Sequence, residues 1–194
     1  MEINPQDQKT ILQLVEQGVD SCTSKLAAIS KTDWQLRTTS MKAFVKADDY
    51  IEKGHPSQYY FGAFCQSSGR VFLAFFNSRS AELITKSFIS GSKGLQATPD
   101  MQEVAICEIA NIVINAVAGS LADRCGMAFI LSAPKPVRGA KADMIKAAFG
   151  DFSNMGKVFG AYIHLSSQEL AADCTLMLML DDLFVNFILN ALDK

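Results

Sequence analysis

The sequence lacks the features that mark nucleic-acid-binding and zinc-binding proteins. Its 18 lysines and arginines are outnumbered by 20 aspartates and glutamates, and no segment interleaves basic with aromatic residues. A nucleic-acid interface needs such a basic surface, so this class is excluded. The two histidines, His55 and His164, stand alone, and the five cysteines form no CxxC pair. Because a zinc site needs about four nitrogen, sulfur or oxygen ligands at suitable spacing, no metal site is expected.

The sequence also shows no secretory signal and no uninterrupted apolar run of membrane-spanning length. The first ten residues are polar and acidic rather than basic and then apolar. The most apolar window, residues 104–122, is interrupted by Glu108, Asn111, Asn115 and Ser120. A carboxylate inside a bilayer is costly, so this window predicts a half-buried helix of a globular protein. The odd, scattered cysteines fit reduced thiols, and we expect a cytoplasmic location.

What the chain does have is enough apolar sequence for a substantial core. Hydrophobic residues make up 49% of its 194 residues and charged residues 20%. This composition and length predict one globular domain over residues 1–194.

Two segments carry the apolar spacing and terminal signals of long helices. The first begins at Pro5, which follows an asparagine cap, and keeps helical spacing to about residue 28. The second begins after Thr98 with a proline and an aspartate, the acid lying at the positive end of the helix dipole. It should run to about Arg124 and stop at Gly126.

The remaining segments predict mostly strands, arranged as hairpins. Residues 59–66 and 70–77 are aromatic and β-branched runs that flank a Ser-Ser-Gly turn. Residues 157–168 and 171–181 predict a closing antiparallel pair. The other expected elements are a strand at 34–47, a polar turn at 48–58, a short helix at 78–91, a strand at 127–133, a proline- and glycine-punctuated loop with a helical turn at 134–154, and a C-terminal helix whose buried face comprises Leu183, Phe184, Phe187, Ile188 and Ala191.

This order of elements predicts an α+β fold, an antiparallel sheet with two long helices packed on one face. The strict alternation of strands and helices that builds a parallel sheet is missing. A long helix followed by strands occurs twice, but the two halves are too dissimilar in sequence to form a repeat.

Three polar residues on the second long helix share one face. On an ideal helix, Asn111 and Asn115 lie about 60° and about 20° to one side of Glu108. Asparagine is a poor helix former, so two asparagines in mid-helix suggest that the amide itself is needed. The simpler alternative is a solvated outer face without function. The aliphatic residues that point elsewhere and can face the sheet are Ile106, Ile109, Val113 and Val117.

The pattern Glu108-x2-Asn111, followed after 22 residues by Pro134, resembles the signature of the CheC/CheX/FliY chemotaxis phosphatases. In that family a glutamate and an asparagine lie one turn apart on a long helix, and a proline follows the next strand. The flanking stretches "GRVFLAFFNSRSAELITKSFISG" and "MAFILSAPKPV" agree with it. One departure is Val104, since the family usually has aspartate or serine four residues before the glutamate.

The resemblance extends to the number of sites. The first helix has Glu16, but Val19 rather than asparagine stands three residues further on. One site per chain resembles the CheX branch, whose members tend to be homodimers.

The resemblance implies that the substrate is the phospho-aspartate of a CheY-like receiver domain. An acyl phosphate is already reactive, so catalysis needs mainly a positioned water. Asn111 would orient that water, and Glu108 would pair with a receiver lysine and dock the helix. Asn115 and Pro134 are substrate-binding candidates, Asn115 by supporting docking and Pro134 by shaping the strand end. Mg²⁺ would come with the receiver, so no cofactor of its own is expected.

Two other interpretations stay open. A module of the same fold could dock to a receiver or a flagellar switch protein without catalysis, and Val104 favours this alternative. A small-ligand or dimerisation domain with an incidental polar stripe is the third interpretation.

Other reactive residues fit simpler roles. Cys107 neighbours Glu108 but has no histidine beside it, so a thiol nucleophile is not expected. His164 lies in an alternating strand and is expected to be structural. The basic residues of the 134–154 loop are expected to be solvated, although they could meet an acidic receiver surface; they are Lys135, Arg138, Lys141 and Lys146.

Overall fold

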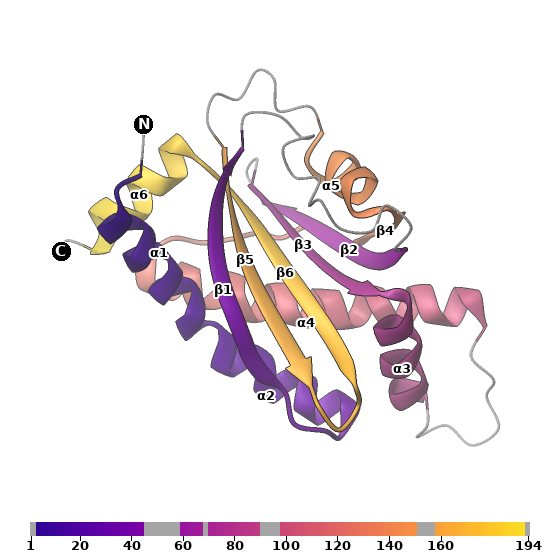
Figure 1. The fold of residues 1–194 in the computed structure, drawn as a ribbon. Helices are drawn as coiled ribbons and strands as arrows, with labels where there is room; N and C mark the ends of the chain where they lie inside the picture. The colour runs from indigo at the N-terminus through magenta and orange to yellow at the C-terminus, as the bar shows by residue number, and fades with distance from the viewer. Residues whose placement is uncertain (1–2, 45–58, 68–69, 90–97, 151–157, 193–194) are drawn as a thin grey trace.

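The computed structural model describes residues 3–44, 59–67, 70–89, 98–150 and 158–192. The expected turn at 48–58 and the expected helix stop at Gly91 lie outside these ranges. The elements within them are α1 Pro5–Gln17, α2 Val19–Ser30, β1 Gln35–Phe44, β2 Tyr60–Ser67, β3 Arg70–Asn77, α3 Ser78–Ile89, α4 Pro99–Cys125, β4 Lys135–Gly139, α5 Lys141–Phe149, β5 Val158–Ser167, β6 Ala172–Asp181 and α6 Asp182–Leu192 (Figure 1).

The strands form one six-stranded sheet in the order β1-β5-β6-β3-β2-β4. Every neighbouring pair is antiparallel. The predicted pairings of β2 with β3 and of β5 with β6 are both confirmed. The α+β architecture with long helices against an antiparallel sheet is therefore confirmed as well.

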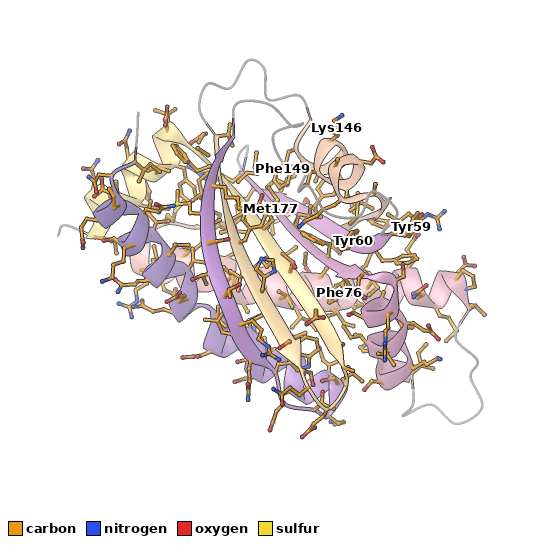
Figure 2. The ribbon with its side chains drawn as sticks, viewed as in Figure 1. Tyr59, Tyr60, Phe76, Lys146, Phe149 and Met177 are labelled. Carbon is orange, nitrogen blue, oxygen red and sulfur yellow. The ribbon has the colours of Figure 1, made fainter. Side chains whose placement is uncertain are left out.

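The two faces of the sheet bury separate cores, because successive strand residues point to opposite sides. One face carries Phe72 and Leu176 and packs against α1, α2, α3, α4 and α6. The other face carries Phe75 and Met177 and packs against α5. Figure 1 shows α4 running behind the sheet, and Figure 2 labels Phe149 of α5 and Met177 of β6, which both belong to the second core. The sheet is thus covered on both sides.

The first long helix is interrupted, unlike the prediction of one helix over 5–28. α1 and α2 meet at Gly18, whose backbone stays near the helical region at φ −73° and ψ −17°. A Cβ built at Gly18 would lie 3.2 Å from the Cα of Val117 and 3.2 Å from the Cβ of Ser120. The break therefore coincides with a close approach of this helix pair to α4.

Helix α4 begins and ends as predicted. The side chain of Thr98 accepts a hydrogen bond from the Met101 N–H, and Gly126 closes the helix in the left-handed conformation at φ +60°. α4 is long and apolar enough to cross a membrane, but 56% of its most apolar window is buried within the protein. The core helix of a globular fold has the same properties, so this is weak evidence for a membrane span.

The expected strand at 127–133 does not form. The segment has no assigned secondary structure; Phe129 packs edge-to-face with Phe72 at 5.5 Å, while Ile130 is 86% exposed. In the described part of the chain, Ser132 joins this segment to β2: its N–H donates to the Gln66 carbonyl at 2.8 Å, and its hydroxyl accepts from the Gln66 N–H at 3.0 Å. The alternating pattern therefore reflects one half-buried side rather than a ladder of hydrogen bonds.

The expected loop at 134–154 contains β4 and α5 over residues 135–149, and residues 151–154 lie outside the described ranges. Pro136 lies within β4, which is tolerated because β4 is an edge strand paired only with β2. α5 buries Met144, Ile145 and Ala148 against the sheet. Two of the basic residues expected in the loop lie over aromatic rings, Lys135 over Phe64 at 5.7 Å and Lys141 over Phe75 at 5.3 Å.

The expected buried face of α6 is confirmed in part. Phe184 and Ile188 are buried and Ala191 packs against the core, as expected. Leu183 is instead 80% and Phe187 41% exposed, and Val185 is buried in their place. The Asp181 side chain accepts a hydrogen bond from the Phe184 N–H at 2.7 Å, which places the start of the helix. Because α6 is apolar around most of its circumference, periodicity alone could not determine the limits of the buried face.

We expect Gly62→Ala to lower the free energy of unfolding by about 1–3 kcal/mol. A Cβ at Gly62 would overlap the carbonyl oxygen of Ala74 and lie 2.9 Å from the Cβ of Phe75. Gly119→Ala is the matched control, because nothing lies within 4 Å of its added Cβ and alanine favours the helix by about 1 kcal/mol. Urea unfolding followed by circular dichroism measures both, and an unchanged midpoint for Gly62→Ala would contradict the close contact.

Candidate functional site

The stripe predicted on the second long helix is present on α4. Glu108 and Asn115 are exposed and Asn111 is half-buried. The four aliphatic residues expected to face the core are at most 2% exposed, namely Ile106, Ile109, Val113 and Val117. The polar groups therefore stand on a rigid helix whose other sides are fixed by packing.

The two asparagines of the stripe are joined to each other. Nδ2 of Asn115 donates to Oδ1 of Asn111 at 2.8 Å and to the backbone carbonyl oxygen of Asn111 at 2.7 Å. This pair of bonds turns the Asn111 amide so that its oxygen faces Asn115. An amide oxygen has two lone pairs and an amide nitrogen two hydrogens, so Asn111 keeps capacity to accept one and donate two further hydrogen bonds.

Glu108 differs from the glutamate of the first helix. In the described part of the chain, no hydrogen bond or ion pair engages the Glu108 carboxylate. Glu16 of α1 is half-buried, and its carboxylate accepts a hydrogen bond from the Thr39 hydroxyl of β1. Glu108 is therefore available to a partner, whereas Glu16 is already engaged within the fold.

Pro134 is not on the stripe. It is half-buried and stands immediately before β4, whose Lys135 pairs with Phe64 of β2. β2 and β4 both pack against α4, so Pro134 lies at the start of a strand that contacts the helix of the candidate site. The role of Pro134 in shaping the strand end or binding substrate stays a prediction.

The thiol beside Glu108 is not set up as a nucleophile. Burial raises the pKa of Cys107, and the carboxylates of Glu103 and Glu108 raise it further. Burial also raises the pKa of Cys65 to about 11 and that of Cys22 to about 12. These thiols are protonated near neutral pH, as expected for structural cysteines.

Neither a metal centre nor a catalytic histidine appears within the ranges that the structure describes. No group of three or more histidine, cysteine, aspartate or glutamate residues there could hold a metal ion. His164 lies in β5, where Nδ1 and the Thr175 hydroxyl are 3.0 Å apart and the ring stacks on Tyr162. These contacts give His164 a structural role within the sheet.

The sequence did not reveal an apolar pocket next to the stripe. It has a volume of about 250 Å³ and lies between the end of α3 and the first turns of α4. Val104 was a signal for such a pocket, because it is an apolar residue on the polar stripe. The sequence could not show that Phe88 of α3 lies across from it. The lining residues are Phe88, Ile89, Asp100, Met101, Val104 and Ala105.

Comparison with solved structures identifies the fold. FliY from Thermotoga maritima matches with a TM-score of 0.71 and 15% identity, covering 100% of this chain and 99% of that chain. The FliG–FliM complex from H. pylori matches with a TM-score of 0.62 and 8% identity, covering 97% and 100%. The chemotaxis protein CheX from Desulfovibrio desulfuricans matches with a TM-score of 0.55 and 11% identity, covering 86% and 97%. No protein-family model and no curated protein gives a significant match.

These comparisons define the fold of the chain. The chain has the fold shared by FliY, CheX, CheC-like proteins and the FliM middle domain. The predicted CheC/CheX/FliY resemblance is thus confirmed at the level of fold, while its CheX branch stays a prediction. The fold includes both chemotaxis proteins and switch proteins, so the activity has to be argued from the site.

We expect the native protein to react slowly with a disulfide reagent such as dithiobisnitrobenzoate at pH 7.5. All five thiols have raised pKa values, so little of the reactive thiolate is present. Cys107 should react first, because it is half-buried while the other four are buried. Absorbance at 412 nm follows the reaction, and Cys107→Ser should remove the first phase. A fast phase that survives in Cys107→Ser would contradict this order.

Proposed function

We propose that the protein is a phosphatase of phospho-aspartate in a CheY-like receiver domain, with Glu108 and Asn111 as its working residues. The observation that carries the proposal is the exposed stripe of α4, where an unengaged carboxylate lies one turn from an amide held in place by Asn115. The same helix position carries the Glu-x2-Asn motif that resembles the chemotaxis phosphatases. The fold shared with FliY and CheX supports this reading.

From this chain, the chemistry needs a positioned amide and a docking carboxylate. A water attacks the phosphorus of the acyl phosphate and the bond between phosphorus and the aspartate oxygen breaks. The aspartate leaves as a carboxylate, and inorganic phosphate leaves with the oxygen and both protons of the water, which then exchange with solvent. The transition state of phosphoryl transfer is loose, so catalysis comes mainly from positioning and charge stabilisation. Asn111 orients the water through its remaining hydrogen-bond capacity. A neutral amide serves this purpose in small GTPases, where a glutamine orients the attacking water.

Glu108 has a docking role in this proposal. It is exposed, and within the described ranges no side chain neutralises it. A lysine of the receiver site pairs with it and sets the register of α4 on the partner. The Mg²⁺ ion that neutralises the phosphoryl group belongs to the receiver. By resemblance to the CheX branch, the working form of the protein is a homodimer.

A second candidate is a docking module without catalysis. FliM, which shares this fold, occurs in a complex with FliG from H. pylori. Val104 is 63% exposed and stands where the phosphatase family usually has aspartate or serine. In this alternative the stripe binds a receiver or a switch protein, and Asn111 contributes to affinity alone.

We expect Asn111→Ala to slow dephosphorylation of a receiver domain by at least about 100-fold at saturating receiver. The variant loses the water-orienting amide while Glu108 keeps docking the partner. A panel of receiver domains phosphorylated by acetyl phosphate is mixed with protein, and release of inorganic phosphate is followed. Glu108→Ala should instead raise the receiver concentration needed for half-maximal rate. Equal rates for wild type and Asn111→Ala on every receiver would eliminate the phosphatase proposal in favour of the docking module.

We expect Asn115→Ala to lower the maximal rate about tenfold without weakening receiver binding, because the Asn111 amide loses the group that orients it. The free energy of unfolding should not fall, since Asn115 is exposed and alanine is the better helix former. Thermal unfolding and steady-state kinetics on the same samples separate the two effects. A rise in the half-saturating receiver concentration, with the maximal rate unchanged, would show that Asn115 docks the partner instead.

A further inference from the structure

The apolar pocket beside the stripe lies on the working face of α4. Of its lining residues, Val104 precedes Glu108 by one helical turn, and an ideal helix places the two within about 40° of each other. The pocket is closed on its other side by Phe88 and Ile89 at the end of α3. Any partner that covers Glu108 and Asn111 therefore also reaches this pocket.

The rim of the pocket exposes apolar side chains that the fold has not covered. Val104 is 63% exposed and Phe88 42% exposed. Their burial by a partner removes apolar surface from water, which favours association. Exposed apolar groups gathered around a hollow mark an interaction site more often than scattered ones do.

Among the described residues of α4 that line or adjoin the pocket, the charges have one sign. Asp100 and Glu108 are exposed and stand one turn before and one turn after Val104 on the same side of α4. No lysine or arginine occurs in α4 before Arg124. On α3, Lys86 forms an ion pair with Glu82 at 2.5 Å, so the two charges offset each other. The pocket is thus an apolar hollow between two carboxylates, and its complement is an apolar side chain flanked by basic groups.

We propose that this pocket is the specificity pocket for the receiver, which inserts one large aliphatic or aromatic side chain between Phe88 and Val104. The inference rests on the proposed function, and it assigns to Val104 a role in selecting the partner. Glu108 and Asp100 pair with basic groups beside the inserted side chain. Val104 then makes an apolar docking contact where the aspartate or serine of the phosphatase family would make a polar one. Its presence does not mean that the phosphatase site has been lost.

The geometry favours a receiver over a second copy of this chain as the occupant. A second copy seated in the pocket would cover Val104 and the adjoining Glu108, and so would exclude the receiver from the stripe. It would also bring its own Asp100 and Glu108 close to those of the first copy, and like charges across an interface are unfavourable.

The test measures receiver affinity and turnover for pocket variants of the full chain. Phe88→Ser and Val104→Asn both alter exposed side chains, so folding should persist, which circular dichroism checks. Leu183→Ser on α6 is the matched control, because Leu183 is equally apolar and 80% exposed but lies on another helix. The probes are receiver domains activated with beryllium fluoride for binding and with acetyl phosphate for turnover.

We expect Phe88→Ser and Val104→Asn to raise Kd and the half-saturating receiver concentration about tenfold, with the maximal rate unchanged and Leu183→Ser equal to wild type. Receiver binding that is unchanged in both pocket variants overturns the pocket inference and leaves the proposed function standing. A change of oligomeric state in Phe88→Ser, with receiver affinity unchanged, would show that a second copy of the chain occupies the pocket. This result also overturns the pocket inference. If no receiver binds wild type, the pocket inference and the proposed function fall together.

Discussion

Helix α4 packs against four other helices and three strands, namely α1, α2, α3, α6, β2, β3 and β4. Its aliphatic residues are buried on several sides, whereas Val104, Glu108 and Asn115 of the stripe are exposed and Asn111 is half-buried. This packing holds the candidate residues on a rigid support, because a helix surrounded in this way cannot rotate without opening the core. The close approach at Gly18 brings the α1–α2 junction against this helix.

The sequence predicted those features that depend on local signals. The cap at Thr98 and the glycine after Cys125 predicted the limits of α4. Positions on an ideal helix separated Ile109 and Val113 from the polar stripe. The hairpins were recognisable because aromatic and β-branched runs flanked turn residues. Each of these signals lies within one element, so no knowledge of the tertiary structure was needed to read it.

The errors arose where tertiary contacts decide between local alternatives. The segment around Phe129 alternates like a strand, yet its partner is an aromatic cluster with Phe72 and Phe184 rather than a neighbouring strand. Pro136 suggested a loop, but an edge strand accommodates it. α6 is apolar on nearly all sides, so the buried side depends on the sheet beneath it. The pocket between Phe88 and Val104 joins two elements, and no pattern within one element could have located it.

The α4 wall of the pocket and the Asn111 amide belong to one uninterrupted helix, which fixes the distance between them. With about 1.5 Å of rise per residue, Val104 and Asn111 lie about 10 Å apart along the axis of α4. Because the helix is held on its other sides, that separation does not adjust to the partner. A receiver whose apolar side chain lies nearer to or farther from its phospho-aspartate would fill the pocket or meet the amide, but not both. In the proposed arrangement the chain therefore selects among chemically similar receivers by distance.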